Sequence, residues 1–334
     1  MINWGIIGAS TIAKEWMINA INASPNSQVT AILSRSQQRG ERFEDQFGIQ
    51  RIYTELDAFL ANPEIDVVYV STTNELHKPQ TLAAAAAQKH VLCEKPLALS
   101  LADAKQMVYA CSKAGLVMGT NHHLRNAVTH RTLRKLIQDG VIGDPLAVRV
   151  FHAVLLPPHL QTWRIKDPST GAGVVLDITV HDTDTLRFIL NDEVESVMAC
   201  TSSQGLGEHG IDDTVMGVMR FERGTLAQFH DSFVIGHAGT GLEVHGTDAS
   251  LIAKDVMTQQ PIGEIALRRG DQMEKVDLPP PVNLYERAVE CFNRAVQGIG
   301  EPAATAEDGL RSLAVALAVQ QSAQTDKQVT LSYA

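Results

Sequence analysis

The sequence predicts an α/β fold in which an N-terminal, doubly wound parallel sheet is followed by a C-terminal α/β domain with a large, open, mostly antiparallel sheet. Three observations support this prediction. Short apolar runs alternate with helical patterns up to about residue 121, a small-residue turn follows the first run, and later strand patterns follow one another without intervening helices. A chain of 334 residues is long enough for two domains, which we place at residues 1–121 and 122–334.

The first domain is expected to contain five parallel strands with helices on both faces of the sheet, because alternating strands and helices build right-handed βαβ units. The strands are predicted at Trp4–Gly8, Val29–Leu33, Asp66–Ser71, His90–Cys93 and Val117–Thr120, and the helices at Thr11–Ala23, Gln37–Phe47, His77–Gln88 and Leu101–Ala114.

The second domain is expected to contain six strands in a mostly antiparallel sheet. The strands are predicted at Ala147–Leu155, Val194–Ser203, Asp213–Phe221, Thr225–Phe233, Thr240–His245 and Ser250–Ala253, and the helices at Ala127–Gln138, Gly173–Leu190, Asn283–Gln297 and Ala306–Thr325. The last helix is long enough to pack back onto the first domain.

Composition and charge exclude several classes of protein. The net charge is −10, of which −1 falls in residues 1–121 and −9 in residues 122–334, and no basic stripe with interleaved aromatic residues suggests a nucleic-acid partner. No run of about 18 apolar residues predicts a membrane span. The four cysteines are scattered without a CxxC pair, and the N-terminus lacks the pattern of an export signal. We therefore expect a cytoplasmic protein without a metal site.

The segment from Gly8 to Ala13 follows the first strand and opens the first helix, the position of a dinucleotide-binding turn. Such a turn presents backbone N–H groups and a helix N-terminus to a pyrophosphate. Ser10 and Ala13 occupy the second and third glycine positions of the usual motif, so the match is degenerate. A plain strand-to-helix turn is the alternative interpretation.

The end of the second strand indicates which dinucleotide binds. NAD enzymes usually have an acidic residue there, whereas this chain has Ser34 and Arg35, with Arg39 four residues later. A hydroxyl and two guanidinium groups suit the additional phosphate of NADP, because Arg makes bidentate phosphate contacts. The alternative is that both arginines lie on a solvated helix face.

Two segments carry candidate catalytic residues. Lys95 lies in the sequence Glu94-Lys95-Pro96 at the carboxyl end of a predicted parallel strand, where ligands bind in such sheets. Pro96 favours a trans peptide bond and an extended conformation at Lys95. A surface lysine in a loop is the alternative.

In the second segment, Asp177, His181 and Asp184 share one face of a predicted helix at i, i+4 and i+7. A carboxylate beside an imidazole can orient it and raise its pKa, which makes a general acid. A metal site and a structural polar face are the alternatives. Trp163 and Arg164 are expected in a loop, where an aromatic ring and a cation could hold a polyol.

These residues resemble the Gfo/Idh/MocA family of NAD(P)-dependent sugar oxidoreductases over essentially the whole chain. Gly5–Ala13, Thr72–His77, Glu94-Lys95-Pro96 and Gly173–Asp184 occur in the order and at the spacing of that family. The resemblance implies an N-terminal Rossmann domain and catalysis by Lys95 and His181, with Asp177 nearby. It also implies NADPH contacts at Gly8, Ser10, Thr11, Ile12, Ala13, Ser34, Arg35, Arg39, Thr72, Thr73, Asn74, Glu75, Leu76, His77, Glu94, Lys95, Asn121, Trp163, Arg164 and Tyr285.

The chain departs from the broader family at three positions. Many members have Gly in place of Ser10, an acid in place of Ser34 and Pro in place of Thr73, and the first two changes affect cofactor preference rather than reaction type. We therefore predict NADPH-dependent reduction of a small sugar ketone by a monomer or by a homo-oligomer formed through the C-terminal sheet. The alternatives are an NAD(P)-dependent polyol or inositol dehydrogenase and a non-catalytic NADP-sensing regulator of the same fold.

Overall fold

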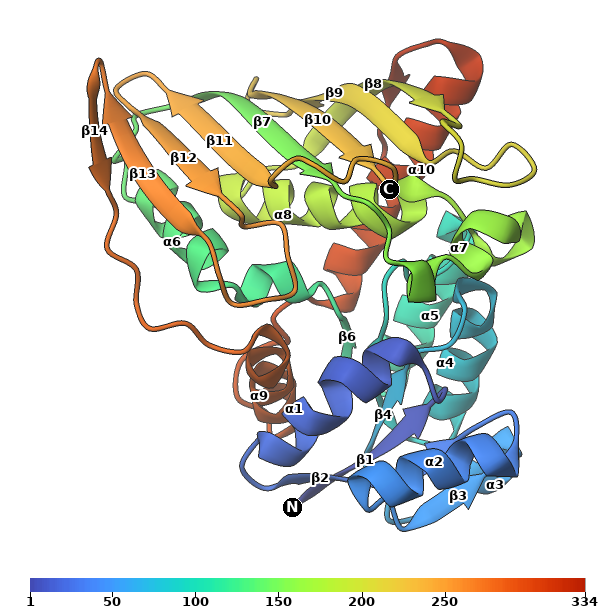
Figure 1. The fold of residues 1–334 in the computed structure, drawn as a ribbon. Helices are drawn as coiled ribbons and strands as arrows, with labels where there is room; N and C mark the ends of the chain where they lie inside the picture. The colour runs from blue at the N-terminus through green and yellow to red at the C-terminus, as the bar shows by residue number, and fades with distance from the viewer. Residues whose placement is uncertain (334) are drawn as a thin grey trace. The chain divides into compact units, whose positions relative to one another are not determined.

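The computed structural model describes residues 1–333 and divides them into two units, each built around one sheet (Figure 1). The first unit contains residues 1–123 and 283–310, and the second contains residues 124–282 and the chain from Arg311 onward. Each unit is therefore made of two separate segments of the chain. The sequence instead predicts a single division between residues 121 and 122.

The first unit contains a six-stranded sheet with the strand order β3-β2-β1-β4-β5-β6, and every neighbouring pair is parallel. The strands are β1 (Ile2–Ile7), β2 (Ser27–Leu33), β3 (Arg51–Tyr53), β4 (Val67–Val70), β5 (His90–Cys93) and β6 (Met118–Thr120). All four residues of β4 are buried, as expected for a central strand covered on both faces. The five predicted strands and their parallel arrangement are confirmed. The additional strand β3 has only three residues and none is buried, so its pattern is weak.

Helices connect these strands and complete the first unit. They are η1 (Ala13–Met17, π-helical), α1 (Ile18–Ala23), α2 (Gln37–Phe47), α3 (Leu56–Leu60), η2 (Asn74–Leu76), α4 (His77–Ala86), α5 (Leu101–Lys113) and α9 (Leu284–Val296). Helix α9 joins this unit because its apolar face covers Trp4, which is fully buried. The ring of Trp4 lies 5.3 Å from the ring of Phe292, and its Nε1–H donates to Asn293 Oδ1 at 3.1 Å.

The second unit contains a nine-stranded sheet with the order β14-β13-β12-β11-β7-β10-β9-β8-β15. The strands are β7 (Pro145–Ala153), β8 (Val194–Ser202), β9 (Thr214–Phe221), β10 (Leu226–Ser232), β11 (Gly241–Gly246), β12 (Ser250–Lys254), β13 (Glu264–Arg269), β14 (Gln272–Lys275) and β15 (Val329–Thr330). Only β7 and β10 pair in parallel, so the predicted mostly antiparallel sheet is confirmed. Strands β13, β14 and β15 are additional to the six predicted.

One face of this sheet is covered by helices α6 and α8 (Figure 1). The helices of the second unit are η3 (His123–Asn126, starting at the unit boundary), α6 (Val128–Gln138), η4 (Pro158–Leu160), α7 (Trp163–Lys166), η5 (Pro168–Thr170), η6 (Val175–Thr179, π-helical) and α8 (Val180–Leu190). Helix α10 (Ala306–Thr325) passes from the first unit into the second at Arg311. The other face of the sheet exposes Met198, Met216 and Val218. Within residues 1–333, no helix is long and apolar enough to cross a bilayer.

Candidate active site

The turn after β1 lies where the strand order of the first sheet reverses, between β2 and β4. Gly8 has a φ of +104°, and a Cβ at this position would lie 2.9 Å from Thr72 Cγ2. Glycine is therefore required both by its backbone conformation and by the close approach of the β4 loop. Ser10 Oγ donates to Ser71 Oγ at 2.9 Å and accepts from the N–H of Ala13 at 3.2 Å. The hydroxyl at the second glycine position thus ties the turn to the end of β4.

The segment from the end of β2 into the first turn of α2 brings candidate phosphate-binding residues to the same turn. Arg39 donates from Nε to the carbonyl oxygen of Ala9 at 2.9 Å, so its guanidinium group lies against the turn after β1. Ser34 is buried, and its Oγ has no hydrogen-bond partner within residues 1–333. Arg35 is exposed. A buried hydroxyl that still lacks a partner, beside cationic side chains at the switch point of the sheet, fits a phosphorylated ribose.

A buried carboxyl group lies at the ends of the neighbouring strands. Glu94 accepts hydrogen bonds from the hydroxyl of Tyr69 and from Asn121 Nδ2, the latter at 2.6 Å. Burial raises the pKa of Glu94, against the opposing effect of these two hydrogen bonds. The pKa of Tyr69 is raised well above its usual value by burial first and by the charge of Glu94 second. Sequence reasoning missed Tyr69, although it is the one polar side chain in a Val-Val-Tyr-Val strand.

His77 connects the two loops that carry the predicted cofactor residues. Its ring is fully buried, with Nδ1 2.9 Å from the carbonyl oxygen of Pro96 and Nε2 3.2 Å from that of Thr72. Burial lowers the pKa of His77, although both carbonyl contacts favour the charged ring. His77 therefore holds the loop after β4 next to the loop after β5. The side chain of Lys95, in the second of these loops, is partly exposed.

The peptide bond between Lys95 and Pro96 is cis, so the predicted trans bond is wrong. The trans preference before proline is only about 0.5–1 kcal/mol, which the folded surroundings can outweigh.

Tyr285 joins this group from the far end of the chain. It lies in the first turn of α9, is fully buried, and is stacked between Trp16 and His123, with both ring centroids 5.2 Å away. Asn283 caps α9 by accepting from the N–H of Tyr285 at 2.9 Å. Tyr285 also raises the pKa of Tyr69, as a smaller effect than burial. The first unit therefore gathers the predicted residues from both of its chain segments.

In the second unit, the predicted catalytic helix begins with a π-helical segment. Asp177 lies in η6 and His181 in the first turn of α8, where its side chain is buried. Arg164 Nε lies 3.3 Å from Asp177 Oδ2, and the Arg164 guanidinium group lies 4.6 Å from the centroid of the Trp163 ring. Trp163 and Arg164 belong to the short helix α7 rather than to the predicted loop. The structure thus brings Trp163, Arg164 and Asp177 together within one unit.

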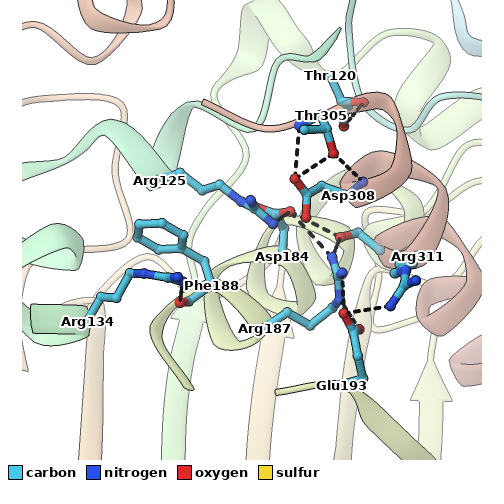
Figure 2. A network of polar contacts seen from close by, with 11 residues as sticks. Thr120, Arg125, Arg134, Asp184, Arg187, Phe188, Glu193, Thr305, Asp308 and Arg311 are labelled. Atoms are coloured by element: carbon cyan, nitrogen blue, oxygen red, sulfur yellow. Dashed lines mark hydrogen bonds and ion pairs between the residues drawn. The ribbon is translucent and has the colours of Figure 1, made fainter. Parts of the chain in front are cut away.

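Asp184, the third residue of the predicted polar face, has a structural role. Its carboxylate forms a bidentate ion pair with Arg125 and accepts from Ser312 Oγ at 3.2 Å (Figure 2). Nearby, Arg187 and Arg311 both contact Glu193, and these pairs lower the pKa of Glu193 against the effect of its burial. Asp184 therefore belongs to a network that holds α10 in the second unit.

The two parts of the chain match models of known protein families. Residues 2–122 match an oxidoreductase family with an NAD-binding Rossmann fold, and residues 130–252 match the GFO/IDH/MocA C-terminal domain. The chain is 54% identical over 325 residues to 1,5-anhydro-D-fructose reductase from Ensifer adhaerens, with 97% of each chain covered.

Two solved structures are similar over nearly the whole chain. Aldose-aldose oxidoreductase from Caulobacter crescentus, complexed with glycerol, has a TM-score of 0.90 and 25% identity, with 99% of each chain covered. A 3-ketoreductase from Actinomadura kijaniata, complexed with NADP and TDP-benzene, has a TM-score of 0.86 and 25% identity, with 96% of this chain and 97% of that chain covered.

Proposed function

The chain belongs to the Gfo/Idh/MocA family of oxidoreductases, and from this premise we propose that it reduces 1,5-anhydro-D-fructose to 1,5-anhydro-D-mannitol with NADPH. The observation that carries the proposal is the 54% identity, over 97% of both chains, to the 1,5-anhydro-D-fructose reductase of Ensifer adhaerens. The proposed substrate is accordingly a small sugar ketone.

NADPH is the proposed cofactor because the end of β2 lacks the carboxylate that would bind a free ribose hydroxyl and would repel a phosphate. The unpartnered hydroxyl of Ser34 and the guanidinium groups of Arg35 and Arg39 are proposed to bind the 2′-phosphate. The turn from Gly8 to Ala13, the segment from Thr72 to His77, and Glu94, Asn121, Trp163, Arg164 and Tyr285 complete the proposed set of contacts. When bound, NADPH supplies the hydride that the substrate carbon accepts.

The protein's own groups handle the charge and the proton at the substrate oxygen. The Lys95 ammonium group is proposed to stabilise the negative charge that develops on the carbonyl oxygen. His181 donates the proton that completes the alcohol, and Asp177 orients its imidazole ring. Arg164, at 3.3 Å from Asp177, holds that carboxylate in place. One hydride on carbon and one proton on oxygen balance the reduction of the ketone.

We propose that the protein assembles as a homo-oligomer in the cytoplasm. Exposed Met198, Met216 and Val218 on the outer face of the nine-stranded sheet favour a homo-oligomer over a monomer. All four cysteines are free thiols, which suits the reducing cytoplasm.

The proposal is tested by following NADPH oxidation with 1,5-anhydro-D-fructose, beside NADH and a panel of sugar ketones and inositols. We expect rapid turnover of 1,5-anhydro-D-fructose with NADPH. Turnover of another polyol or ketone alone would contradict the proposed substrate and support the polyol dehydrogenase alternative. NADPH binding without turnover of any compound would instead support the NADP-sensing regulator.

A further inference from the structure

Asp231 on β10 contacts the helical segment that carries Asp177 and His181. Thr179 Oγ1 donates to Asp231 Oδ2 at 2.6 Å, and the charge of the Asp182 carboxyl group acts on that of Asp231. Thr179, Asp182 and Asp231 are all fully buried. Asp231 thus binds the residue two positions before His181 and interacts electrostatically with the carboxyl group one position after it.

The position of Asp231 is unusual for a carboxyl group. Along β10, Ala227, Phe229 and Asp231 alternate with more exposed residues and point to the same covered face of the sheet. A carboxyl group buried on such a face is unfavourable unless other groups satisfy it. The partners of Asp231 are therefore the reason that this position can hold an acid.

The two carboxyl groups satisfy each other by sharing a proton. Within residues 1–333, Asp182 Oδ2 and Asp231 Oδ1 have no hydrogen-bond partner, so one proton held between the two carboxyl groups would satisfy both oxygens. Burial raises the pKa of Asp182 to about 7. Burial and then the charge of Asp182 raise the pKa of Asp231 well above its usual value. Both raised pKa values favour a proton held between the two carboxyl groups.

The remaining neighbours of the pair come from two further elements. His152 on β7 is the register partner of Asp231, and its Nδ1 lies 2.7 Å from Asp182 Oδ1. His130 on α6 is fully buried, and burial first and His152 second lower its pKa to about 4. His130 is therefore neutral at pH 7. Asp182 and His152 are left as the groups that can carry charge beside the shared proton.

The contacts of Asp231 lie on both sides of a change in helix geometry. The π-helical segment η6 ends at Thr179 and α8 begins at Val180, so the change falls between Asp177 and His181. The two geometries place successive side chains at different angles around the axis. The angle between the His181 and Asp177 side chains around the helix axis therefore depends on the residue at which the π-helix ends and the α-helix begins.

We propose that Asp231 is a positioning residue that fixes the orientation of His181 relative to Asp177, by holding Thr179 and Asp182 on the two sides of this junction. The inference rests on the proposed role of His181 as proton donor. Asp231 does not touch the substrate in this scheme. It acts through the helix, so its effect on turnover requires the His181 imidazole.

The test begins with Thr179→Val, which removes one hydrogen bond to Asp231 while keeping the shape of the side chain. Thr183→Val is the matched control, because Thr183 lies in α8 four residues after Thr179, is fully buried, and has no hydrogen-bond partner for its Oγ1 within residues 1–333. We expect Thr179→Val to lower kcat about tenfold with the KM for NADPH unchanged, since tenfold corresponds to about 1.4 kcal/mol, which is within the contribution of one hydrogen bond. Thr183→Val should stay within about twofold of the wild type. Equal kcat values for the two variants would overturn the proposal.

A second measurement separates positioning from general stability. Both Thr variants are repeated in a His181→Ala background, where Thr179→Val should produce no further loss of kcat, because coupled residues are not additive. The same tenfold loss in that background would show that Thr179 acts through the fold, and would overturn the proposal. If His181→Ala alone keeps the wild-type kcat, the proposed function itself is contradicted. The His181→Ala variant is therefore measured first, so that this failure is distinguished from a failure of the role proposed for Asp231.

Substitution of Asp231 supplies the rescue experiment. Asp231→Asn keeps a neutral donor for Asp182 and an acceptor for Thr179, so it should retain most of the kcat that Asp231→Ala loses. Equal loss in both folded variants would overturn the proposal. If Asp231→Ala does not fold, the comparison of Thr179→Val with Thr183→Val decides the question.

Discussion

Arg125 and Asp184 form a bidentate ion pair in the interior of the second unit, with Nε–Oδ2 and Nη2–Oδ1 distances of 2.7 and 2.8 Å (Figure 2). Their side chains are only 8% and 1% exposed. Removing one partner leaves a buried charge without a counter-charge, so we expect Asp184→Ala to lower the free energy of unfolding by about 3–5 kcal/mol. Urea denaturation of the purified variant measures this loss.

An exposed ion pair provides the control for that prediction. Arg51 and Glu64 lie 2.9 Å apart with side chains 42% and 54% exposed, so Glu64→Ala should lower the free energy of unfolding by less than about 1 kcal/mol. Replacing both buried partners, as in Arg125→Met with Asp184→Leu, should recover part of the lost stability. Equal losses for Asp184→Ala and Glu64→Ala would contradict a stabilising role for the buried pair.

Lys95→Ala should lower kcat for ketone reduction by about 10²–10³-fold, because it removes the group proposed to stabilise charge on the carbonyl oxygen. Affinity for NADPH, measured by titration of cofactor fluorescence, should be nearly unchanged. Lys113→Ala is the control, since Lys113 is exposed at the end of α5. Turnover of Lys95→Ala close to that of Lys113→Ala would rule out the proposed role.

Ser34→Asp should shift the cofactor preference from NADPH towards NADH. A carboxylate at the end of β2 can bind the ribose hydroxyls of NADH, and it repels the 2′-phosphate of NADPH. We expect the ratio of kcat/KM for NADPH to that for NADH to fall about 10–100-fold, since a hydrogen bond to a charged group contributes about 1.5–3 kcal/mol. Ser34→Ala, which adds no charge, should change the ratio less. An unchanged ratio in Ser34→Asp would place the phosphate elsewhere.

The carboxyl pair of Asp182 and Asp231 should make the stability of the protein depend on pH. Burial raises the pKa of Asp182 from 3.8 to about 7, so between these values the folded chain binds more protons than the unfolded chain. This contribution to stability is fully present below pH 3.8 and is lost as the pH rises through 7. Wild-type protein should therefore lose more unfolding free energy between about pH 5 and 8 than a variant that carries Asn at both positions.

The double Asn variant keeps an amide hydrogen bond between the two side chains and an acceptor for His152. His130 and His152 are present in both proteins, so the comparison reports the carboxyl pair together with its contact to His152. Equal slopes of unfolding free energy against pH, measured by urea denaturation, would argue against the shared proton.

Local patterns were sufficient for most of the fold. A continuous apolar run such as Val67–Val70 predicts a central parallel strand, and the alternation of buried and exposed residues along β10 predicts a strand with one covered face. Both patterns can be recognised from neighbouring residues alone. The three-residue strand β3 is too short and too exposed to show such a pattern.

The candidate site could be predicted only in part. The glycine turn and the absence of an acid near Ser34 are local features, and the structure confirms that Gly8 needs its positive φ and its lack of a side chain. The roles of Tyr69, Asp184 and Asp231 depend on partners 25 to 128 residues away in the chain. Those partners are set by sheet order and by helix packing, and no single-sequence pattern specifies them. The cis bond before Pro96 likewise depends on its folded surroundings.

The return of residues 283–310 to the first unit has a consequence for the order of events on the ribosome. Until this segment emerges, Trp4 lacks Phe292 and Asn293, Trp16 lacks Tyr285, and the N–H of Thr120 lacks the carbonyl oxygen of Ala304. The nascent chain must therefore carry an unfinished N-terminal unit, with apolar surface open to water, while the entire nine-stranded sheet except β15 is being translated. A fragment ending at residue 123 reproduces that nascent state rather than a self-sufficient nucleotide-binding domain.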